Sequence, residues 1–342
     1  ARVAESVLHG GADFVLRRVT GSISLAQLTV MSSLMVAMTW ILIGLFENIM
    51  SIMKNGMFIS NLRGFMAYQE KIPEDQDGVM PEGKFETLEF DHVSFSYKEE
   101  ETIKDLSFTI KEGEITALVG HNGAGKTTII KLLLRLYDPV SGVIRLNGRD
   151  IREYNLHAYR ELFAVTFQDF SIFGLTVMEN VLMGRHGEND EQVAADALKK
   201  AGMYEKVMSL PNGMHTVMTK EFDADGAVFS GGESQKIAVA RTFAKDSYIK
   251  IFDEPSSALD PISEYELFQN IMKEGSDHTM FFISHRLSSV KKCDKVFMLE
   301  GGRLIEEGSH TELMARNGSY AKMYRRQAMN YLALDTDEEV AN

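Results

Sequence analysis

The chain begins with a long apolar stretch and then changes to short apolar runs separated by polar segments. No charged side chain occurs between Val19 and Phe46. Within this window, residues 28–46 are long enough to cross the roughly 30 Å hydrocarbon core of a bilayer as a helix. The pattern predicts a last membrane helix at about residues 25–53. The alternative is a long buried helix in a water-soluble protein.

One membrane helix leaves little material for a membrane domain, so we expect further helices upstream and interpret residues 1–72 as the end of such a domain. The part of this segment that follows the apolar window is polar and is interpreted as its cytoplasmic extension. The chain starts at Ala1 and lacks a signal-peptide pattern, which indicates a fragment. Prolines, glycines and acidic residues between Pro73 and Gly83 predict a linker at 73–84.

After the linker, short apolar runs of strand length alternate with helical stretches. This alternation predicts an α/β domain with a largely parallel core sheet over residues 85–328. The first run, at residues 85–97, alternates polar and apolar positions as an edge-type strand does. An acidic tail at 329–342 is expected to be disordered. The other predicted strands are 114–120, 248–254 and 278–285, and the clearest helices are 126–137 and 189–203.

The net charge and the cysteine count limit the kinds of partner and of covalent cross-link that the chain can have. The formal net charge of −13 argues against nucleic acid, because phosphate backbones are bound by basic surfaces. The single cysteine, Cys293, excludes an intrachain disulfide and is interpreted as a buried, inert thiol.

The segment GHNGAGKTT at residues 120–128 matches the phosphate-binding loop pattern between an apolar strand and an aliphatic helix. Its glycines let backbone N–H groups point at phosphate oxygens, and the following helix contributes its positive N-terminal end. Lys126 is expected to reach the β- and γ-phosphates, and Thr127 to bind Mg²⁺. The predicted nucleotide-binding residues of this loop are Gly120, Asn122, Gly123, Gly125, Lys126, Thr127 and Thr128.

Two acids follow the apolar run at 248–252. Asp253 suits a Mg²⁺ ligand, because this hard cation takes oxygen ligands. Glu254, one residue further, can polarise an attacking water as the general base. Gln168 and His285 also follow apolar runs, although neither signal means much in isolation. Ser230, Gly231 and Gly232 open a helix, either as a simple cap or as part of a site.

In combination, and in this order, these motifs resemble the ATP-binding cassette of ABC transporters over about residues 85–326. The resemblance implies a P-loop NTPase fold with a RecA-like core sheet, an antiparallel β subdomain and an α-helical subdomain. It also implies that Ser230, Gly231, Gly232 and Glu233 bind the ATP held by Lys126 of a second cassette. By the same resemblance His285 is the γ-phosphate switch, Tyr97 stacks on adenine, Gln168 binds nucleotide and metal, and 257–260 signals across the dimer.

Three features depart from the family pattern. Phe229 stands where leucine is usual, Glu233 stands where glutamine is usual, and residues 219–228 do not match the common exporter sequence. Phe229 can still serve as an apolar anchor. A carboxylate at position 233, near a γ-phosphate, has no explanation from the sequence.

A membrane helix fused to a cassette resembles the exporter arrangement. We therefore expect an ATP-hydrolysing exporter half that uses ATP and Mg²⁺ and works as a homodimer or heterodimer with a second half-transporter. It is expected in the plasma (inner) membrane, multi-pass in the full protein, with a cytoplasmic cassette and an unknown cargo. The alternatives are the ATPase subunit of an importer and a non-transport ATPase.

Overall fold

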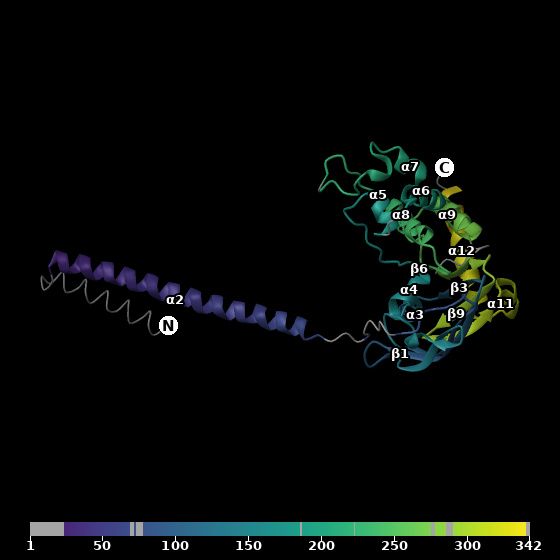
Figure 1. Cartoon of the computed structure of the whole chain (residues 1–342), viewed down its shortest axis with the longest axis horizontal. Helices are drawn as coiled ribbons and strands as arrows, with labels where there is room; N and C mark the ends of the chain where they lie inside the picture. The colour runs from purple at the N-terminus through teal and green to yellow at the C-terminus, as the bar shows by residue number, and fades with distance from the viewer. Residues whose placement is uncertain are drawn as a thin grey trace. The chain divides into compact units, whose positions relative to one another are not determined.

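The computed structural model describes residues 24–68, 72, 78–184, 187–221, 223–274, 278–284 and 290–339. The chain divides into two compact units, Ala1–Lys71 and Ile72–Asn342, which are treated separately below (Figure 1). His285, residues 1–23 and residues 73–77 of the predicted linker lie outside the described residues.

The first unit contains one long helix, α2 (Leu25–Met66), which begins at a capping box between Ser24 and Gln27. Among the described residues it is the one helix long and apolar enough to span a membrane, with a mean hydropathy of 2.0. None of the apolar segment of α2 that gives this value is buried inside the protein. The exposed apolar surface argues against the buried helix of a water-soluble protein, and it is the surface that a membrane or neighbouring membrane helices would cover.

The described residues of the second unit form two sheets. The larger has the order β10-β9-β3-β8-β7-β6 and is parallel apart from its last hairpin, which confirms the predicted core sheet. The smaller is antiparallel, with the order β2-β1-β4-β5. The strands are β1 (Thr87–Ser96), β2 (Glu101–Lys111), β3 (Ile115–Gly120), β4 (Ser141–Leu146), β5 (Arg149–Asp150), β6 (Phe163–Thr166), β7 (Ile249–Asp253), β8 (Thr279–Ile283), β9 (Lys295–Glu300) and β10 (Arg303–Gly308).

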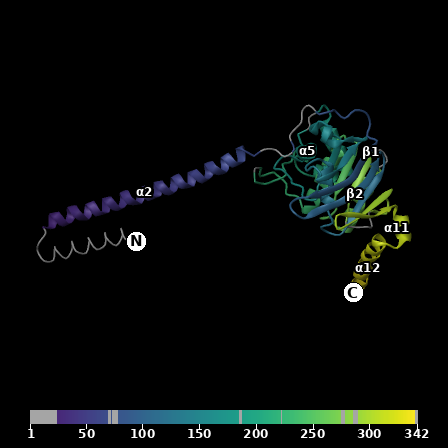
Figure 2. The ribbon, with the colours of Figure 1, turned by 90° about the horizontal axis from the view of Figure 1, so that it is seen from below.

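The position predicted for the first strand was wrong. β1 is not an edge strand: it pairs with β2, next to it in Figure 2, and on its other side with β4. Its alternation arises because Leu88, Phe90 and Val93 enter the core while the intervening residues are more exposed. An alternating pattern reports that one face of a strand is buried, and it carries no information about neighbouring strands.

The core sheet is covered on both faces, which explains the continuous apolar run of β3. Leu118 faces a core shared with the small sheet, whereas Ala117 and Val119 face a second core shared with helices. Figure 1 shows α5, α6, α7 and α8 gathered at one end of the cassette. The helices are α3 (Lys126–Leu133), α4 (Leu156–Glu161), α5 (Val177–Leu182), α6 (Asp190–Lys200), α7 (Tyr204–Met208), α8 (Gly231–Ala244), α9 (Pro261–Glu274), α11 (His310–Arg316) and α12 (Ser319–Glu339), with 3-10 turns at Ile151–Glu153 and Gly213–His215.

Two remaining expectations concern the C-terminal part. Cys293 is buried, and burial raises the pKa of its thiol to about 12, which agrees with an inert side chain. The acidic tail was expected to be disordered, but α12 continues into it as far as Glu339. The segment contains Leu and Ala between its acids, and these residues favour helix.

One glycine pair allows a test of the small sheet. Gly142 and Gly148 have nearly equal positive φ angles of 80° and 79°, but a Cβ at Gly142 would lie 2.2 Å from the carbonyl oxygen of His92. A Cβ at Gly148 would meet no described atom within 4 Å. We expect Gly142→Ala to cost about 1–3 kcal/mol more than the control Gly148→Ala in denaturant unfolding. Equal costs would contradict the close packing of β4 on His92.

Candidate nucleotide site

The predicted phosphate loop connects the end of β3 to the start of α3. Gly125 caps α3 with a φ of 101°, a conformation that side chains rarely adopt. A Cβ at this position would also lie 2.6 Å from Cδ1 of Ile103. The loop therefore requires glycine here for two reasons, backbone conformation and the close approach of β2.

Lys126 is folded back over the loop. Its Nζ donates to the carbonyl oxygens of Gly120 at 2.9 Å and His121 at 3.1 Å, and the residue is only 7% exposed. Burial lowers the pKa of Lys126, and the charges of Glu254 and Asp253 oppose that effect. An ammonium held in this way lies within the loop, where a phosphate can replace the carbonyl oxygens as its partner.

Thr127 and Asp253, distant in sequence, are in contact. The Thr127 hydroxyl donates to Oδ2 of Asp253 at 3.0 Å. The other oxygen, Oδ1, is buried and has no hydrogen-bond partner among the residues that the structure describes. Burial raises the pKa of Asp253 to about 6, with the Thr127 hydrogen bond acting in the opposite direction.

These two oxygen donors fit Mg²⁺. A buried carboxylate oxygen without a partner is costly unless a cation or water satisfies it. Within the described ranges no group of three or more His, Cys, Asp and Glu side chains is arranged to hold a metal ion. This does not exclude Mg²⁺, because that ion commonly takes only one or two ligands from the protein and the others from phosphates and water. Thr127 and Asp253 would hold such an ion, which would neutralise phosphate charge.

The parallel sheet brings one further predicted residue to the same edge. Gln168 is exposed and lies two residues after β6, which pairs with β7 as far as Thr166 and Phe252. Because parallel strands end at one edge, this topology places Gln168 at the edge where β7 ends with Asp253 and β3 ends at the loop.

Glu254 adopts an uncommon backbone conformation. Its φ is 50°, in the left-handed region that non-glycine residues seldom occupy, and its N–H donates to the carbonyl oxygen of Ile283 at 2.9 Å. Strained backbone of this kind concentrates at functional sites, where the surroundings hold it in place. The geometry agrees with a functional carboxylate, although its role as a base stays a prediction.

Tyr97 directly follows β1, and unlike the apolar residues of that strand it is not buried. Val93 and Phe95 are buried, whereas Tyr97 is 46% exposed. Its ring meets that of Tyr137 edge-on at 5.2 Å, and its hydroxyl lies 3.4 Å from the Thr128 hydroxyl at the start of α3. An exposed aromatic face beside the loop supports adenine stacking. Tyr137 was not predicted as a site residue, because in the sequence it is only an aromatic residue a few positions after α3.

Residues 230–233, called the signature below, form a helix start that explains the glutamate at position 233. Ser230 caps α8, its Oγ accepting from the N–H of Glu233, while the Glu233 carboxylate accepts from the N–H of Ser230 at 2.8 Å. Glu233 also forms an ion pair with Lys206 of α7 at 3.5 Å. The backbone hydrogen bond from Ser230 is the main reason that the pKa of Glu233 is lowered. A glutamate at this position therefore stabilises the helix start.

The signature and the phosphate loop do not meet within one chain. No hydrogen bond or ion pair within the described ranges links residues 230–233 to residues 120–128. Phe229, just before them, packs against the helical core as an apolar anchor. The structure therefore does not join these two predicted parts of a nucleotide site within one chain.

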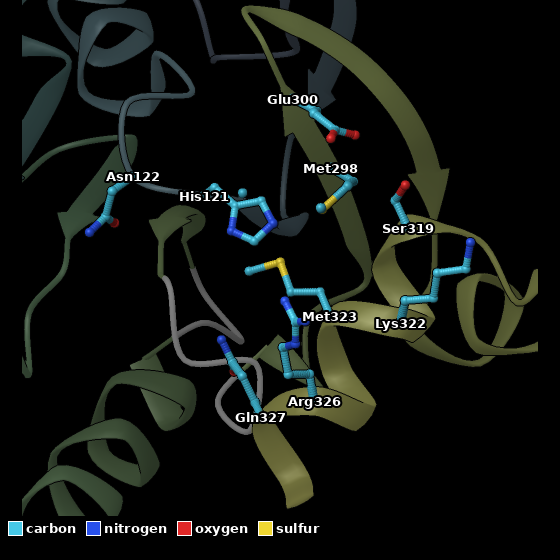
Figure 3. Close-up of a pocket in the computed structure, with 10 residues that line it drawn as sticks. His121, Asn122, Met298, Glu300, Ser319, Lys322, Met323, Arg326 and Gln327 are labelled. Atoms are coloured by element: carbon cyan, nitrogen blue, oxygen red, sulfur yellow. The ribbon is translucent and has the colours of Figure 1, made fainter. Parts of the chain in front are cut away.

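A pocket of about 800 Å³ lies beside the first half of the loop (Figure 3). In the close-up, His121 and Met323 of α12 point toward each other across it, and Asn122 lies to the left with its side chain directed away from α12. Lys126, Thr127 and Asp253 do not line the pocket. It therefore adjoins the phosphate-binding part of the loop without containing it.

A strand–loop–helix with a buried carboxylate against the loop threonine defines a P-loop nucleotide-binding domain. Residues 103–257 match the family model described as ABC transporter. The chain belongs to the ABC transporter family.

Its relatives include exporters with different named cargos. The chain is 40% identical over 244 residues to the ATP-dependent lipid A-core flippase of Burkholderia thailandensis, a match covering 70% of this chain and 40% of the relative. It is 38% identical over 276 residues to the mitochondrial iron-sulfur clusters transporter ATM1 of Saccharomyces cerevisiae, covering 80% of this chain and 38% of the relative. The chain thus spans about 40% of the length of these curated relatives.

A solved structure is similar over most of the chain. A bacterial Atm1-family ABC exporter with ATP bound matches with a TM-score of 0.73 and 30% identity, covering 90% of this chain and 53% of that one. The fold is accordingly that of an ABC cassette preceded by an apolar helix.

Proposed function

We propose that the chain is the ATP-hydrolysing half of a membrane exporter. The observation that carries this proposal is the contact between Thr127 and Asp253 beneath the phosphate loop, with an unsatisfied carboxylate oxygen beside it. The exposed apolar surface of α2 supports a chain that couples this site to a membrane domain and disfavours a separate importer ATPase subunit.

Each residue of the site has a separate role in the proposed reaction. Lys126 and the loop N–H groups bind the β- and γ-phosphates, and Tyr97 carries the adenine. Thr127, Asp253 and Gln168 would hold Mg²⁺, which would supply positive charge beside the phosphates. Glu254 polarises the attacking water, and His285 contacts the γ-phosphate. Backbone groups positioned in advance do not need to reorganise during the reaction.

The signature residues Ser230, Gly231 and Gly232 complete the site of a second cassette. Their N–H groups begin α8, where the helix end attracts a phosphate. ATP then holds two cassettes together, and hydrolysis releases them. The partner is a second half-transporter, identical or different, and since the relatives' names give different cargos, we assign no cargo.

The charges beside α2 do not by themselves determine its orientation in the membrane. Lys54 and Arg63 follow the apolar window, and Arg17 and Arg18 precede it, so basic residues occur on both sides. We propose that α2 lies in the plasma (inner) membrane with the cassette in the cytoplasm, as the fused exporter arrangement implies.

The function is tested with the full chain in lipid nanodiscs. Mg²⁺ and ATP together are expected to give phosphate release that stops when EDTA removes the metal. ATP hydrolysis that is insensitive to EDTA would contradict the role of Thr127 and Asp253, and absence of hydrolysis would contradict the proposal itself.

Glu233 provides a second test of the signature. Glu233→Gln keeps an acceptor for the Ser230 N–H but removes a negative charge close to the partner's phosphate. We expect ATP-driven association of the chain to strengthen about three- to tenfold, with the difference shrinking as salt increases. Association constants from analytical ultracentrifugation at two salt concentrations provide the measurement. Weaker association in the variant would show that the carboxylate itself contributes to the interface.

A further inference from the structure

The helix that begins at the signature also contacts the loop after Glu254. Gln235 lies on α8, one turn beyond Gly231, and is 1% exposed. Its Nε2 donates to the carbonyl oxygen of Glu254 and to Oγ of Ser257, each at 3.0 Å, while its Oε1 accepts from the N–H of Ala258 at 2.8 Å. One side chain therefore binds three successive points of this loop.

The same helix start packs against the loop a second time. A Cβ at Gly232 would lie 3.0 Å from the carbonyl oxygen of Ala258 and 3.1 Å from Cδ2 of Leu259. Leu259 is itself buried in the helical core. The residue after Gly231 is thus in close contact with the loop, so a displacement of the first turn of α8 must displace residues 258–259.

Both peptide groups of Glu254 are held by neighbouring elements. Its N–H donates to Ile283 of β8, and its carbonyl oxygen accepts from Gln235 of α8. Because its φ of 50° is intrinsically unfavourable, these contacts help to hold the backbone from which the carboxylate extends. The same carbonyl oxygen also accepts from the N–H of Ser257 at 3.3 Å, within the loop itself, so Gln235 is the contact that ties this peptide group to α8.

We infer that Gln235 is a positioning residue that fixes Glu254 to the signature helix. This inference rests on the proposed function, in which the signature binds the partner's ATP and Glu254 acts on the chain's own ATP. Phosphate binding at residues 230–232 orders the first turn of α8, and Gln235 transmits that order to Glu254. Each chain thereby links the two nucleotide sites of the dimer through one side chain.

Thr242 offers a matched control for a merely structural role. It lies on the same helix, is also 1% exposed, and forms a buried hydrogen bond of 2.6 Å with the Thr166 hydroxyl. Its hydroxyl contacts β6 and not the loop after Glu254. Loss of this bond in Thr242→Val removes buried polar contacts from α8 without affecting Glu254.

The experiment compares Gln235→Met with Thr242→Val in the full chain in nanodiscs. Methionine keeps the length of the side chain and removes the amide. We expect kcat for ATP hydrolysis to fall about 10- to 100-fold in Gln235→Met, because a displaced catalytic group loses its alignment. The KM for ATP should stay unchanged, and the Hill coefficient for ATP should fall to one. Thr242→Val should keep the wild-type kcat and Hill coefficient.

The outcomes separate the inference from the function on which it rests. An active wild-type chain whose kcat and Hill coefficient are unchanged in Gln235→Met would overturn the inference alone. So would an equal fall of kcat in both variants, which would indicate a structural effect of polar contacts in α8. A wild-type chain without ATP hydrolysis would overturn the proposed function and the inference together. Thermal unfolding of both variants checks that each is folded at the assay temperature.

Discussion

Glu254→Gln is expected to bind ATP and associate as the wild type does, but to hydrolyse ATP about 100-fold more slowly or worse. The amide has nearly the shape of the carboxylate, so the backbone contacts of Glu254 with Ile283 and Gln235 can persist. It cannot accept the proton of the attacking water. Single-turnover hydrolysis and ATP binding, measured on the same preparation, separate the two effects.

Glu205→Gln provides the charge-matched control, because Glu205 is an exposed residue of α7 far from the phosphate loop in sequence. It should have wild-type kinetics. Hydrolysis by Glu254→Gln at a rate close to that of wild type would remove this residue from the mechanism. The proposed site would then need a different base.

Lys126→Met is expected to weaken ATP binding by about 100-fold, since charge-assisted hydrogen bonds to phosphate contribute several kcal/mol. The apo protein should lose little stability, because burial already disfavours the charged form of this lysine. Fluorescence titration with a nucleotide analogue gives the affinity, and thermal unfolding gives the stability of the apo chain.

Lys131→Met is the control, since Lys131 lies on α3 one turn further and belongs to the helix rather than the loop. Its affinity for nucleotide should match the wild type. If Lys126→Met bound nucleotide as tightly as the control, the loop would not be the phosphate site. A large loss of apo stability would instead indicate that the two carbonyl contacts of Lys126 support the fold.

The sequence was most informative where a short segment determines its own geometry. The loop at 120–128 could be predicted because glycines, a lysine and a hydroxyl occur together between a strand and a helix. The carboxylate of Asp253 could be assigned because it follows a buried strand. Its contact with Thr127 could not, because 126 residues separate the two and only the order of the sheet brings them together.

Other features depend on neighbours that a one-dimensional pattern does not contain. Alternation in β1 revealed a buried face but not the two strands beside it. A carboxylate at position 233 was unexpected next to a phosphate, but in the structure it accepts a hydrogen bond from the N–H of Ser230. No sequence pattern indicates a role for Gln235, because its hydrogen-bond partners lie in a loop about twenty residues further along the chain. The role of His285 stays a prediction, since it lies outside the described residues.

The central claim is that each chain carries two halves of different sites, and mixing two inactive variants tests it most directly. Lys126→Met removes the phosphate loop's lysine and leaves the signature intact. Gly231→Asp places a negative charge at the signature, and a Cβ at Gly231 would meet no described atom within 4 Å, so the first side-chain atom fits without a clash. For an equal mixture that reassorts freely into pairs, one intact site forms in about half of the pairs.

The measurement is ATP hydrolysis by each variant alone and by the mixture, in the same detergent or nanodisc preparation. The account predicts almost no activity for either variant and about a quarter of the wild-type activity for the mixture, since half of the pairs hold one of two sites. A mixture no more active than the sum of its components, with reassortment shown by differently tagged chains, would contradict it. So would full activity of Gly231→Asp alone.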